Sequence, residues 1–253
     1  MPAADDVELA ASLAREAGLM AARMLADGLH TEHKTSISDV VSAADHAAEA
    51  LVVERLAAAR PKDGVVGEEG TDRPAARTWF VDPVDGTYNF LRGLPIWCAA
   101  IALADETGPL AGAVYQPTAD ELWAGGPAHP TTRNGVPLPP LEDAPLHRLS
   151  VASYLHPTTL PDPGARQPLL RIMQGAATVR MLGSGSIELA AVAAGRLGVW
   201  AQIDSLPWDW LPGSCLVLAA GGACQVVQAH GHRWHVAGPP TAVAETLALI
   251  DQP

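Results

Sequence analysis

The sequence contains little cysteine and no long apolar run. Three cysteines, Cys98, Cys215 and Cys224, occur in 253 residues, without the CxxC spacing of a redox or zinc motif. This sparse, odd set excludes a small secreted fold held by disulfides. No apolar run approaches the roughly 18 residues that span a membrane, and acidic Asp5 and Glu8 stand where a signal peptide carries basic residues. We therefore expect a cytoplasmic protein.

Basic residues are also scarce. The chain has 16 Lys and Arg against 28 Asp and Glu, which gives a formal net charge of −12. Such a charge repels nucleic-acid phosphates and anionic membranes, so we expect neither as a partner. An acidic protein that acts on an anionic substrate would need bound cations to reverse the local sign of the charge.

The chain does have enough apolar sequence for a full core, since 48% of its residues are hydrophobic and 17% are charged. Helical periodicity predicts two amphipathic helices, at about 5–27 and 42–59. The pattern then changes to short segments rich in β-branched and aromatic residues, which predict a mostly antiparallel sheet. These segments are 65–66, 78–81, 96–103, 110–115 and 121–124.

A proline-rich stretch at 127–145, with the turn pair Asn134-Gly135, predicts a boundary at about residue 147. We expect 1–147 to form an α+β half that carries metal-binding loops, and 148–253 to form an α/β half that completes the site. Strands and helices alternate in the second half. The predicted strands are 149–155, 178–182, 199–203, 224–227 and 234–236, and the predicted helices are 165–175, 186–194, 209–220 and 241–250.

Acidic residues stand at the ends of three predicted elements: Glu68-Glu69 after a strand, Asp82 and Asp85 in a Pro-containing turn, and Asp209 before a helix. Taken singly, each has a structural interpretation as a solvated loop or a helix cap. Taken together, convergent carboxylates require cations, and Mg²⁺ takes hard oxygen ligands completed by water and phosphate. We expect two or three Mg²⁺ ions, with phosphate oxygens at the helix start predicted beside these acids.

These motifs resemble those of a known family, the inositol monophosphatase-like, lithium-sensitive, Mg²⁺-dependent phosphatases. The resemblance rests on Gly-Glu-Glu at 67–69, Asp-Pro-Val-Asp-Gly-Thr-Tyr-Asn-Phe at 82–90 and Trp-Asp at 208–209, with weaker matches at Lys34 and at 183–185. It implies a layered αβαβα sandwich, a homodimer, and a phosphate monoester as substrate.

The resemblance also implies a role for each matching residue. It assigns the metal ions to Glu68, Asp82, Asp85, Asp209 and the carbonyl of Val84. Thr87 and Asp45, with Glu68, would act on a metal-activated water that attacks phosphorus, without a covalent phosphoenzyme. The amides of Gly86 and Thr87 would bind phosphate, and Ser184, Gly185 and Gln202 would contact the substrate. The residues of this implied site are all present in the sequence.

The residue that would contact the alcohol differs from the animal enzymes of the family, which have glutamate where this chain has Gln202. We expect inositol 1-phosphate as substrate. The alternatives are histidinol phosphate, which resemblances at Pro212 and 92–97 favour, and other small sugar or nucleotide phosphates. An inactive metal- or phosphate-binding regulatory paralogue is disfavoured, because the acids and Thr87 are all present.

Some polar residues keep two interpretations. Gly183 to Ser186 could touch substrate hydroxyls or could join a strand to a capped helix. His230, His232 and His235 have spacing that could ligate zinc, but they surround Gly231, and we favour a solvated hairpin turn. Cys98 and Cys215 lie in apolar segments, which indicates core packing.

Overall fold

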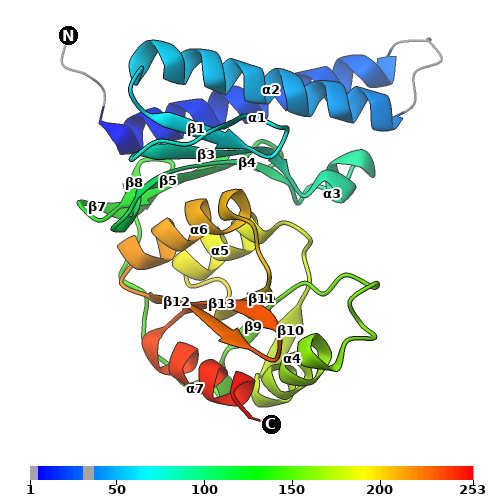
Figure 1. The fold of residues 1–253 in the computed structure, drawn as a ribbon, viewed down its shortest axis with the longest axis vertical. Helices are drawn as coiled ribbons and strands as arrows, with labels where there is room; N and C mark the ends of the chain where they lie inside the picture. Colours follow the sequence, from blue (N-terminus) through cyan, green and yellow to red (C-terminus); the bar gives the residue numbers. More distant parts are fainter. Residues whose placement is uncertain (1–4, 31–36, 253) are drawn as a thin grey trace.

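A computed structural model describes residues 5–30 and 37–252, and these residues form alternating layers of helix and sheet (Figure 1). Helices α1 (Asp6–His30) and α2 (Ile37–Ala59) cover the outer face of an eight-stranded sheet. Helices α5 (Gly185–Ala193) and α6 (Pro207–Ala219) separate it from a five-stranded sheet, whose outer face is covered by α4 (Pro163–Gly175) and α7 (Pro240–Ile250). The predicted αβαβα sandwich is confirmed.

The first sheet has the order β2-β1-β3-β4-β5-β6-β7-β8. Its neighbouring strands are antiparallel except for the parallel pair β1 and β3. Buried side chains such as Leu13, Trp79 and Ile101 fill the space between this sheet and its two helices. The strand bounds are β1 Gly64–Gly67, β2 Asp72–Arg73, β3 Thr78–Asp85, β4 Cys98–Asp105, β5 Gly108–Gln116, β6 Glu121–Gly126, β7 His129–Arg133 and β8 Val136–Pro137.

The proline-rich stretch is more ordered than a linker. It contains the hairpin of β7 and β8, whose turn places Asn134 and Gly135 at φ values of 50° and 77°. Pro137 fits there because β8 is the edge strand, where a missing N–H costs no ladder hydrogen bond. A short 3₁₀ helix, Leu146–Arg148, then leads into the second sheet.

The second sheet has the order β10-β9-β11-β13-β12 and mixes parallel and antiparallel pairs. Strand β9, the first of this sheet along the chain, is shorter than the predicted 149–155, because regular pairing stops at Ala152. Helices α5 and α6 are apolar on nearly every side, which suits a layer enclosed by two sheets. The strand bounds are β9 Ser150–Ala152, β10 Thr178–Arg180, β11 Val199–Ile203, β12 Ala223–Ala229 and β13 His232–Gly238.

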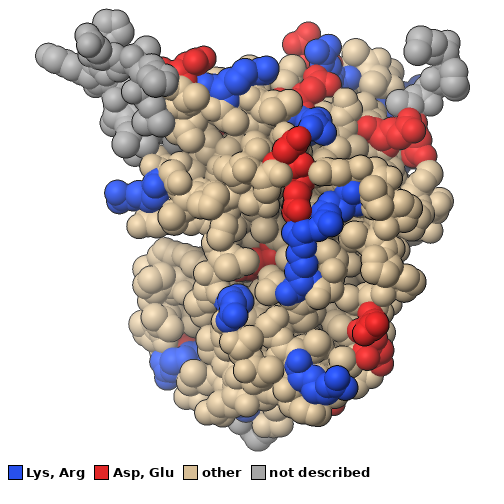
Figure 2. Space-filling view, turned by 180° about the vertical axis from the view of Figure 1, so that it is seen from behind, with Lys and Arg blue, Asp and Glu red and all other residues tan. Residues whose placement is uncertain are grey.

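The molecular surface mixes charges of both signs. On the face shown in Figure 2, acidic and basic side chains alternate instead of separating by sign. Surface ion pairs include Arg15–Asp120 at 2.5 Å and Arg196–Glu121 at 2.8 Å. Among the described helices, none combines the length and apolar composition needed to cross a bilayer.

Candidate active site

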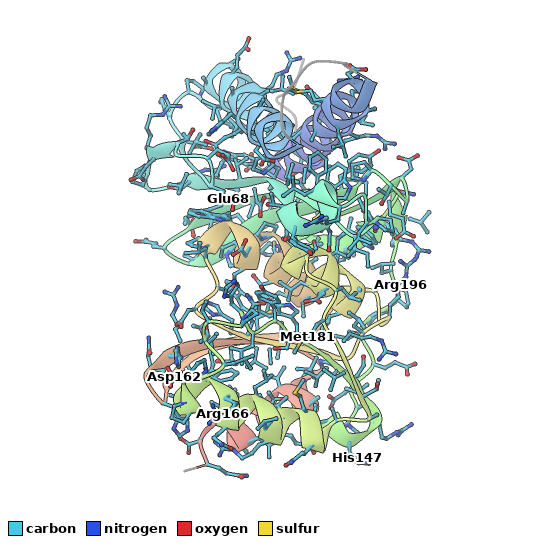
Figure 3. The ribbon with its side chains drawn as sticks, turned by 90° about the vertical axis from the view of Figure 1, so that its right-hand side faces the viewer. Glu68, His147, Asp162, Arg166, Met181 and Arg196 are labelled. Carbon is cyan, nitrogen blue, oxygen red and sulfur yellow. The ribbon has the colours of Figure 1, made fainter. Side chains whose placement is uncertain are left out.

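The first acidic loop follows β1 and is held from behind by helix α2. Glu49, 4% exposed, accepts hydrogen bonds from the amides of Glu69 (2.7 Å) and Thr71 (3.0 Å). A Cβ at Gly67 would overlap this carboxylate, so only glycine lets the loop approach so closely. The amide of Glu68 donates to the carbonyl of Val81 in β3 (3.1 Å). The chain thus fixes Glu68 where the first sheet meets the middle helices (Figure 3).

An irregularity in β3 positions the second pair of acids. Asp82 lies opposite Ala100 of β4 and Asp85 lies opposite Cys98, so β3 has one more residue than β4 between these pairs. Side chains three apart on a regular strand point to opposite faces, and an extra residue corrects this. Proline is tolerated at such a bulge, and Pro83 lies within it. Both carboxylates therefore belong to one site.

Asp85 is held by the start of helix α5. Its Oδ2 accepts the amide of Ser186 at 2.6 Å, and the hydroxyl of Ser184 and the amide of Gly185 also interact with the carboxylate. Burial raises the pKa of Asp85, and these three partners from α5 partly offset the rise. Residues from two different layers thus meet at this carboxylate.

The loop before α5 is braced against the loop after β3. Asn89, in the short helix α3 (Thr87–Leu91), donates to the carbonyls of Ile96 (2.7 Å) and Leu182 (2.8 Å). Gly86 caps α3 at φ 96°, and a Cβ there would press on the carbonyl of Gly183 at 3.1 Å. Glycine is required twice over at residue 86, by its conformation and by this close approach.

A buried glutamate holds the same loop from the other side. Glu188 is 1% exposed, and its two oxygens accept from the amide of Leu182 (2.6 Å) and the indole N–H of Trp200 (3.0 Å). Burial raises the pKa of Glu188 to about 7, although these donors favour the ionised form. The loop from Leu182 to Ser186 is therefore fixed by Asn89 and by Glu188.

Helix α6 contributes the last predicted acid. It begins at Pro207, so Asp209 lies within its first turn and accepts the amide of Leu206 at 3.4 Å. Burial raises the pKa of Asp209 to about 7, and the negative charges of Asp85 and Glu68 add to the rise.

The four acids lie within electrostatic range of one another. Asp82, 1% exposed, has a pKa raised well above its usual range by burial and then by the charges of Asp85, Glu68 and Asp209. Asp82 also shares hydrogen bonds with Glu68 and Asp209. Carboxylates held together in this way cannot all ionise without compensating positive charge.

The donor set suits a hard divalent cation. Every group is a carboxylate or carbonyl oxygen, as Mg²⁺ prefers. Within residues 5–30 and 37–252, no three acids, histidines or cysteines already surround one point as the ligands of a bound ion do. Mg²⁺ keeps several waters and needs only one or two carboxylates, so a site for this ion does not require a closed protein cage.

The residues predicted to act on water lie beside these acids. The Thr87 hydroxyl donates to the carbonyl of Val84 (3.2 Å), which is itself a predicted ligand. Asp45 projects from α2, is 5% exposed, and has an Oδ1 atom without a hydrogen-bond partner. Burial, and then the charges of Glu69 and Glu68, raise the pKa of Asp45 to about 7. Such an orphaned buried oxygen marks a position for a ligand or water.

The predicted substrate contacts are less uniform. Gln202 is partly buried on β11, opposite His235 of β13. Ser184 is buried against Asp85, and its hydroxyl lies 3.7 Å from the Cys98 sulfur. Lys34, which matched the family weakly, lies outside the described residues.

Several single-residue interpretations are corrected by the structure. Asp82 and Asp85 belong to a strand rather than to a helix cap, because the bulge extends β3 through Asp85. Asp209 is likewise not the cap of α6.

The histidines also differ from the solvated turn that we favoured. His230 lies in the hairpin turn, but His235 is buried. His232 is held between Asp204 (2.6 Å) and Asp162 (2.8 Å), and the hydrogen bond with Asp204, then that with Asp162, raises its pKa against the effect of burial. Sequence spacing gave no sign of these partners, which lie far away in the chain. Cys98 and Cys215 are buried, as predicted.

Three residues that support the site were not predicted: Glu49, Asn89 and Glu188. Each bonds to the backbone of a loop rather than to another side chain of the acid cluster. Glu188 stands in an otherwise apolar helical segment, and a charge in such a segment was the available signal. Glu49 follows Asp45 and His46 in α2, so its segment offered no such signal.

Comparison with known proteins identifies the family to which the chain belongs. The model of the inositol monophosphatase family matches residues 4–249. The chain is 36% identical to an inositol-1-monophosphatase of Rhizobium meliloti, covering 73% of this chain and 71% of that one. It is 33% identical to a histidinol-phosphatase of Mycobacterium tuberculosis, covering 98% and 96%.

A solved structure provides a third comparison. Inositol monophosphatase-II of Staphylococcus aureus superposes with a TM-score of 0.82 at 25% identity, covering 94% of this chain and 92% of that one. The family match, the relatives and the shared fold lead to one conclusion: this chain belongs to the inositol monophosphatase family and is a phosphoric monoester hydrolase.

Proposed function

We propose that the protein is a Mg²⁺-dependent phosphatase of a small phosphorylated metabolite. The observation that carries the proposal is the buried Asp82, surrounded by the charges of Asp85, Glu68 and Asp209. Members of this family use divalent metal ions, and buried acids that face one another are a site for them.

The acids and one carbonyl would hold two or three ions: Glu68, Asp82, Asp85, Asp209 and Val84. When bound, Mg²⁺ would supply positive charge that neutralises phosphate and makes water a nucleophile near neutral pH. Hydrogen bonds from α5 occupy one side of Asp85 and fix its orientation. The protein's main contributions are positioning and charge neutralisation, which are what phosphoryl transfer requires.

The attacking water would be oriented by Thr87, Asp45 and Glu68. Thr87 already bonds to Val84, and Asp45 has an unpartnered oxygen. The amides of Gly86 and Thr87, two partly exposed residues at the start of α3, would bind phosphate oxygens. Water attacks phosphorus directly, and the alcohol leaves from the opposite side.

The substrate we propose is inositol 1-phosphate, with Ser184, Gly185 and Gln202 on the substrate side of the site. The support is the match to inositol monophosphatases and the partly buried position of Gln202 at the end region of β11. An amide there can hydrogen-bond a polyol hydroxyl as donor or acceptor.

Histidinol phosphate is the second candidate. Two observations favour it: the match to a histidinol-phosphatase extends over 98% of this chain, and the neutral Gln202 replaces the charged acceptor of the animal enzymes. The two candidates share the phosphate site and differ only in the alcohol.

Three further properties complete the proposal. The chain forms a homodimer and is inhibited by Li⁺, as its resemblance to the family implies, and it acts in the cytoplasm, as the sequence composition leads us to expect. Residues 1–147 form the half that carries most of the metal-binding loops, and 148–253 form the half that completes the site with Asp209.

One assay series tests the function. Removal of metal by a chelator should abolish phosphatase activity, and added Mg²⁺ should restore it, whereas full activity in excess chelator would contradict the metal mechanism. The restored enzyme is then compared on inositol 1-phosphate, histidinol phosphate, adenosine 3′,5′-bisphosphate and fructose 1,6-bisphosphate. No turnover of any phosphomonoester would favour the regulatory paralogue.

A further inference from the structure

Trp200 of β11 lies where the second sheet meets the middle helices α5 and α6. It is completely buried, in one apolar cluster with Leu189 of α5 and Leu216 of α6. The proposed phosphatase mechanism gives this residue no role. Its contacts nevertheless reach the starts of both helices, and these starts position two of the acids, Asp85 and Asp209.

The indole N–H of Trp200 reaches the loop before α5 through one carboxylate. Glu188 Oε2 accepts this N–H at 3.0 Å, and Glu188 Oε1 accepts the amide of Leu182 at 2.6 Å. Both donors favour the ionised form of Glu188, against the burial that raises its pKa. A hydrogen bond to an ionised acceptor is stronger than one between neutral groups, so Trp200 is firmly connected to this loop.

The Trp200 ring also lies against the start of α5. A Cβ added at Gly185 would stand 3.5 Å from Trp200 Cζ2. The following residue, Ser186, donates its amide to Asp85 at 2.6 Å. A shift of the ring or of its N–H would therefore move the amide that orients this acid.

The face of the Trp200 ring holds the start of α6. It stacks on Trp210, with the ring centroids 5.7 Å apart and the planes 29° from parallel. The amide of Trp210 donates to the carbonyl of Leu206 at 3.0 Å, and Asp209 accepts the amide of Leu206 at 3.4 Å. Consecutive helical residues differ by about 100° in direction, so Trp210 packs on Trp200 while Asp209 faces the other acids.

Packing alone does not require a partner for the Trp200 N–H. Trp123 and Trp234 are similarly buried, and among the described residues neither of their Nε1 atoms has a hydrogen-bond partner. A buried carboxylate adds a desolvation cost that apolar packing would avoid. The pair of Trp200 and Glu188 therefore indicates a positional constraint.

We propose that Trp200 is a positioning residue of the phosphatase site. Through Glu188 and Trp210 it fixes the starts of α5 and α6 relative to each other. Asp85 and Asp209 are thereby placed to bind the same ions. The inference rests on the proposed Mg²⁺-dependent function, and it concerns affinity for the ions rather than the chemical step.

The test is a calorimetric titration of the full-length protein with Mg²⁺, in wild type and two variants. Trp200→Phe keeps an aromatic ring but removes the N–H that Glu188 accepts. Trp234→Phe removes the same atoms on the opposite face of the same sheet, where no described residue accepts the N–H. We expect Trp200→Phe to bind Mg²⁺ about fivefold more weakly, a smaller loss than removal of a ligand's direct partner causes. Trp234→Phe should leave the affinity unchanged.

Kinetic constants separate positioning from a general loss of packing. The kcat of Trp200→Phe should fall at low Mg²⁺ and return to the wild-type value at saturating Mg²⁺, because mass action refills the site. Trp234→Phe should keep the wild-type Mg²⁺ dependence, even if urea unfolding shows that both variants are equally destabilised.

Glu188→Gln tests the same bond from its other end and remains informative if Trp200→Phe folds poorly. Its NH₂ group must face the N–H of either Leu182 or Trp200, so it should also weaken Mg²⁺ binding. When Glu188→Gln and Trp200→Phe are combined, the amide oxygen can accept from Leu182 while the NH₂ group faces a ring. The combined loss of affinity should therefore be smaller than the product of the two single losses.

Three results overturn the inference and leave the metal site standing. The first is equal Mg²⁺ affinity in Trp200→Phe and Trp234→Phe. The second is a double variant whose loss equals the product of the single losses. The third is a fall in the kcat of Trp200→Phe that saturating Mg²⁺ does not restore. If the wild-type protein binds no Mg²⁺, the proposed function fails and this inference fails with it.

Discussion

Two kinds of buried carboxylate stand close together in this protein. The oxygens of Glu49 and Glu188 accept backbone and indole N–H groups, so the chain itself satisfies each charge. Within the described residues, Asp82 and Asp209 each accept only one backbone amide and also face other acids, and Asp45 has an oxygen with no partner.

The hydrogen-bond partners distinguish the two kinds of acid. The first kind holds loops of the native structure in place, and the second kind requires a bound cation. A carboxylate that accepts N–H donors holds its loop in place without a bound ion. A carboxylate that faces other carboxylates destabilises the native structure unless a cation is bound. Buried acidic residues can therefore have two different roles in this protein. Substitutions should distinguish an acid that holds a loop from an acid that requires a cation.

The largest expected effect is on catalysis. Thr87→Ala leaves every acid in place but removes the hydroxyl that would orient water, so kcat should fall by about 10² or more. Added Mg²⁺ should restore little of this loss. The measurement is kcat across a Mg²⁺ titration.

Asp209→Asn is the matched variant. It replaces a charged oxygen ligand with a neutral amide, so high Mg²⁺ should rescue it in part. If added Mg²⁺ restores kcat equally in both variants, Thr87 does not orient the water.

The second effect concerns stability and contrasts the two kinds of acid directly. Glu188→Gln places an amide NH₂ against an N–H donor and should cost about 1–3 kcal/mol of unfolding free energy. Asp82→Asn removes a charge that three other acids repel and keeps a side-chain oxygen for the Val84 amide, so in chelator it should unfold at the same or higher denaturant concentration. Urea unfolding of both variants with chelator makes the comparison, and equal destabilisation would erase the distinction.

The third effect is a dependence of stability on pH. In the folded, metal-free protein the pKa values of Asp209 and Asp45 are raised to about 7 from the usual 3.8, and that of Glu188 is raised to about 7 from the usual 4.5. The folded state therefore binds more protons than the unfolded state between these values. Stability should therefore fall as pH rises from about 4 to about 7 and should level off above that.

Urea unfolding at pH 5 and pH 8 checks this expectation, with chelator and then with Mg²⁺. Mg²⁺ should remove the part of the loss at pH 8 that Asp209 and Asp45 cause, because it compensates these ionised acids, and should leave the part that Glu188 causes. Metal-free stability that stays level or rises over this range would contradict the assignment of these acids as uncompensated.

The smallest expected effect is on substrate selection. Gln202→Glu restores the charged acceptor of the animal enzymes, and a charged hydrogen bond exceeds a neutral one by about 1 kcal/mol, or roughly fivefold. The measurement is the kcat/KM ratio of inositol 1-phosphate to a simple aryl phosphate. An unchanged ratio would place Gln202 outside the alcohol pocket.

Much of the fold follows from local patterns. Helical periodicity located α1, α2 and α7, and strand patterns located β11 to the residue. The missed pieces are short: β2, β7 and β8 contain two to five residues, and two of them lie in a segment where prolines suggested a loop. Prolines on an edge strand leave no local sign of the pairing that the neighbouring strand provides.

The site was predictable where acidic residues stand at the ends of several predicted elements. The acid motifs indicated the residues whose charges the structure brings together, because several carboxylates at element ends are unusual without a cation. Glu49, Glu188 and Asn89 escaped notice because they bond to backbone atoms distant in the chain. His235 was misjudged for the same reason, since its burial depends on Trp210 in another layer.

Because of the extra residue in β3, the site depends on the number of residues between Asp82 and Asp85 as well as on which acidic residues are present. Deleting one residue between Asp82 and Asp85 would restore regular pairing with β4 and leave every predicted acid in the sequence. It would nevertheless turn Asp85 to the other face of the sheet, away from α5. In comparisons among relatives, the spacing of these two aspartates should therefore mark an active enzyme better than the identity of the residues between them.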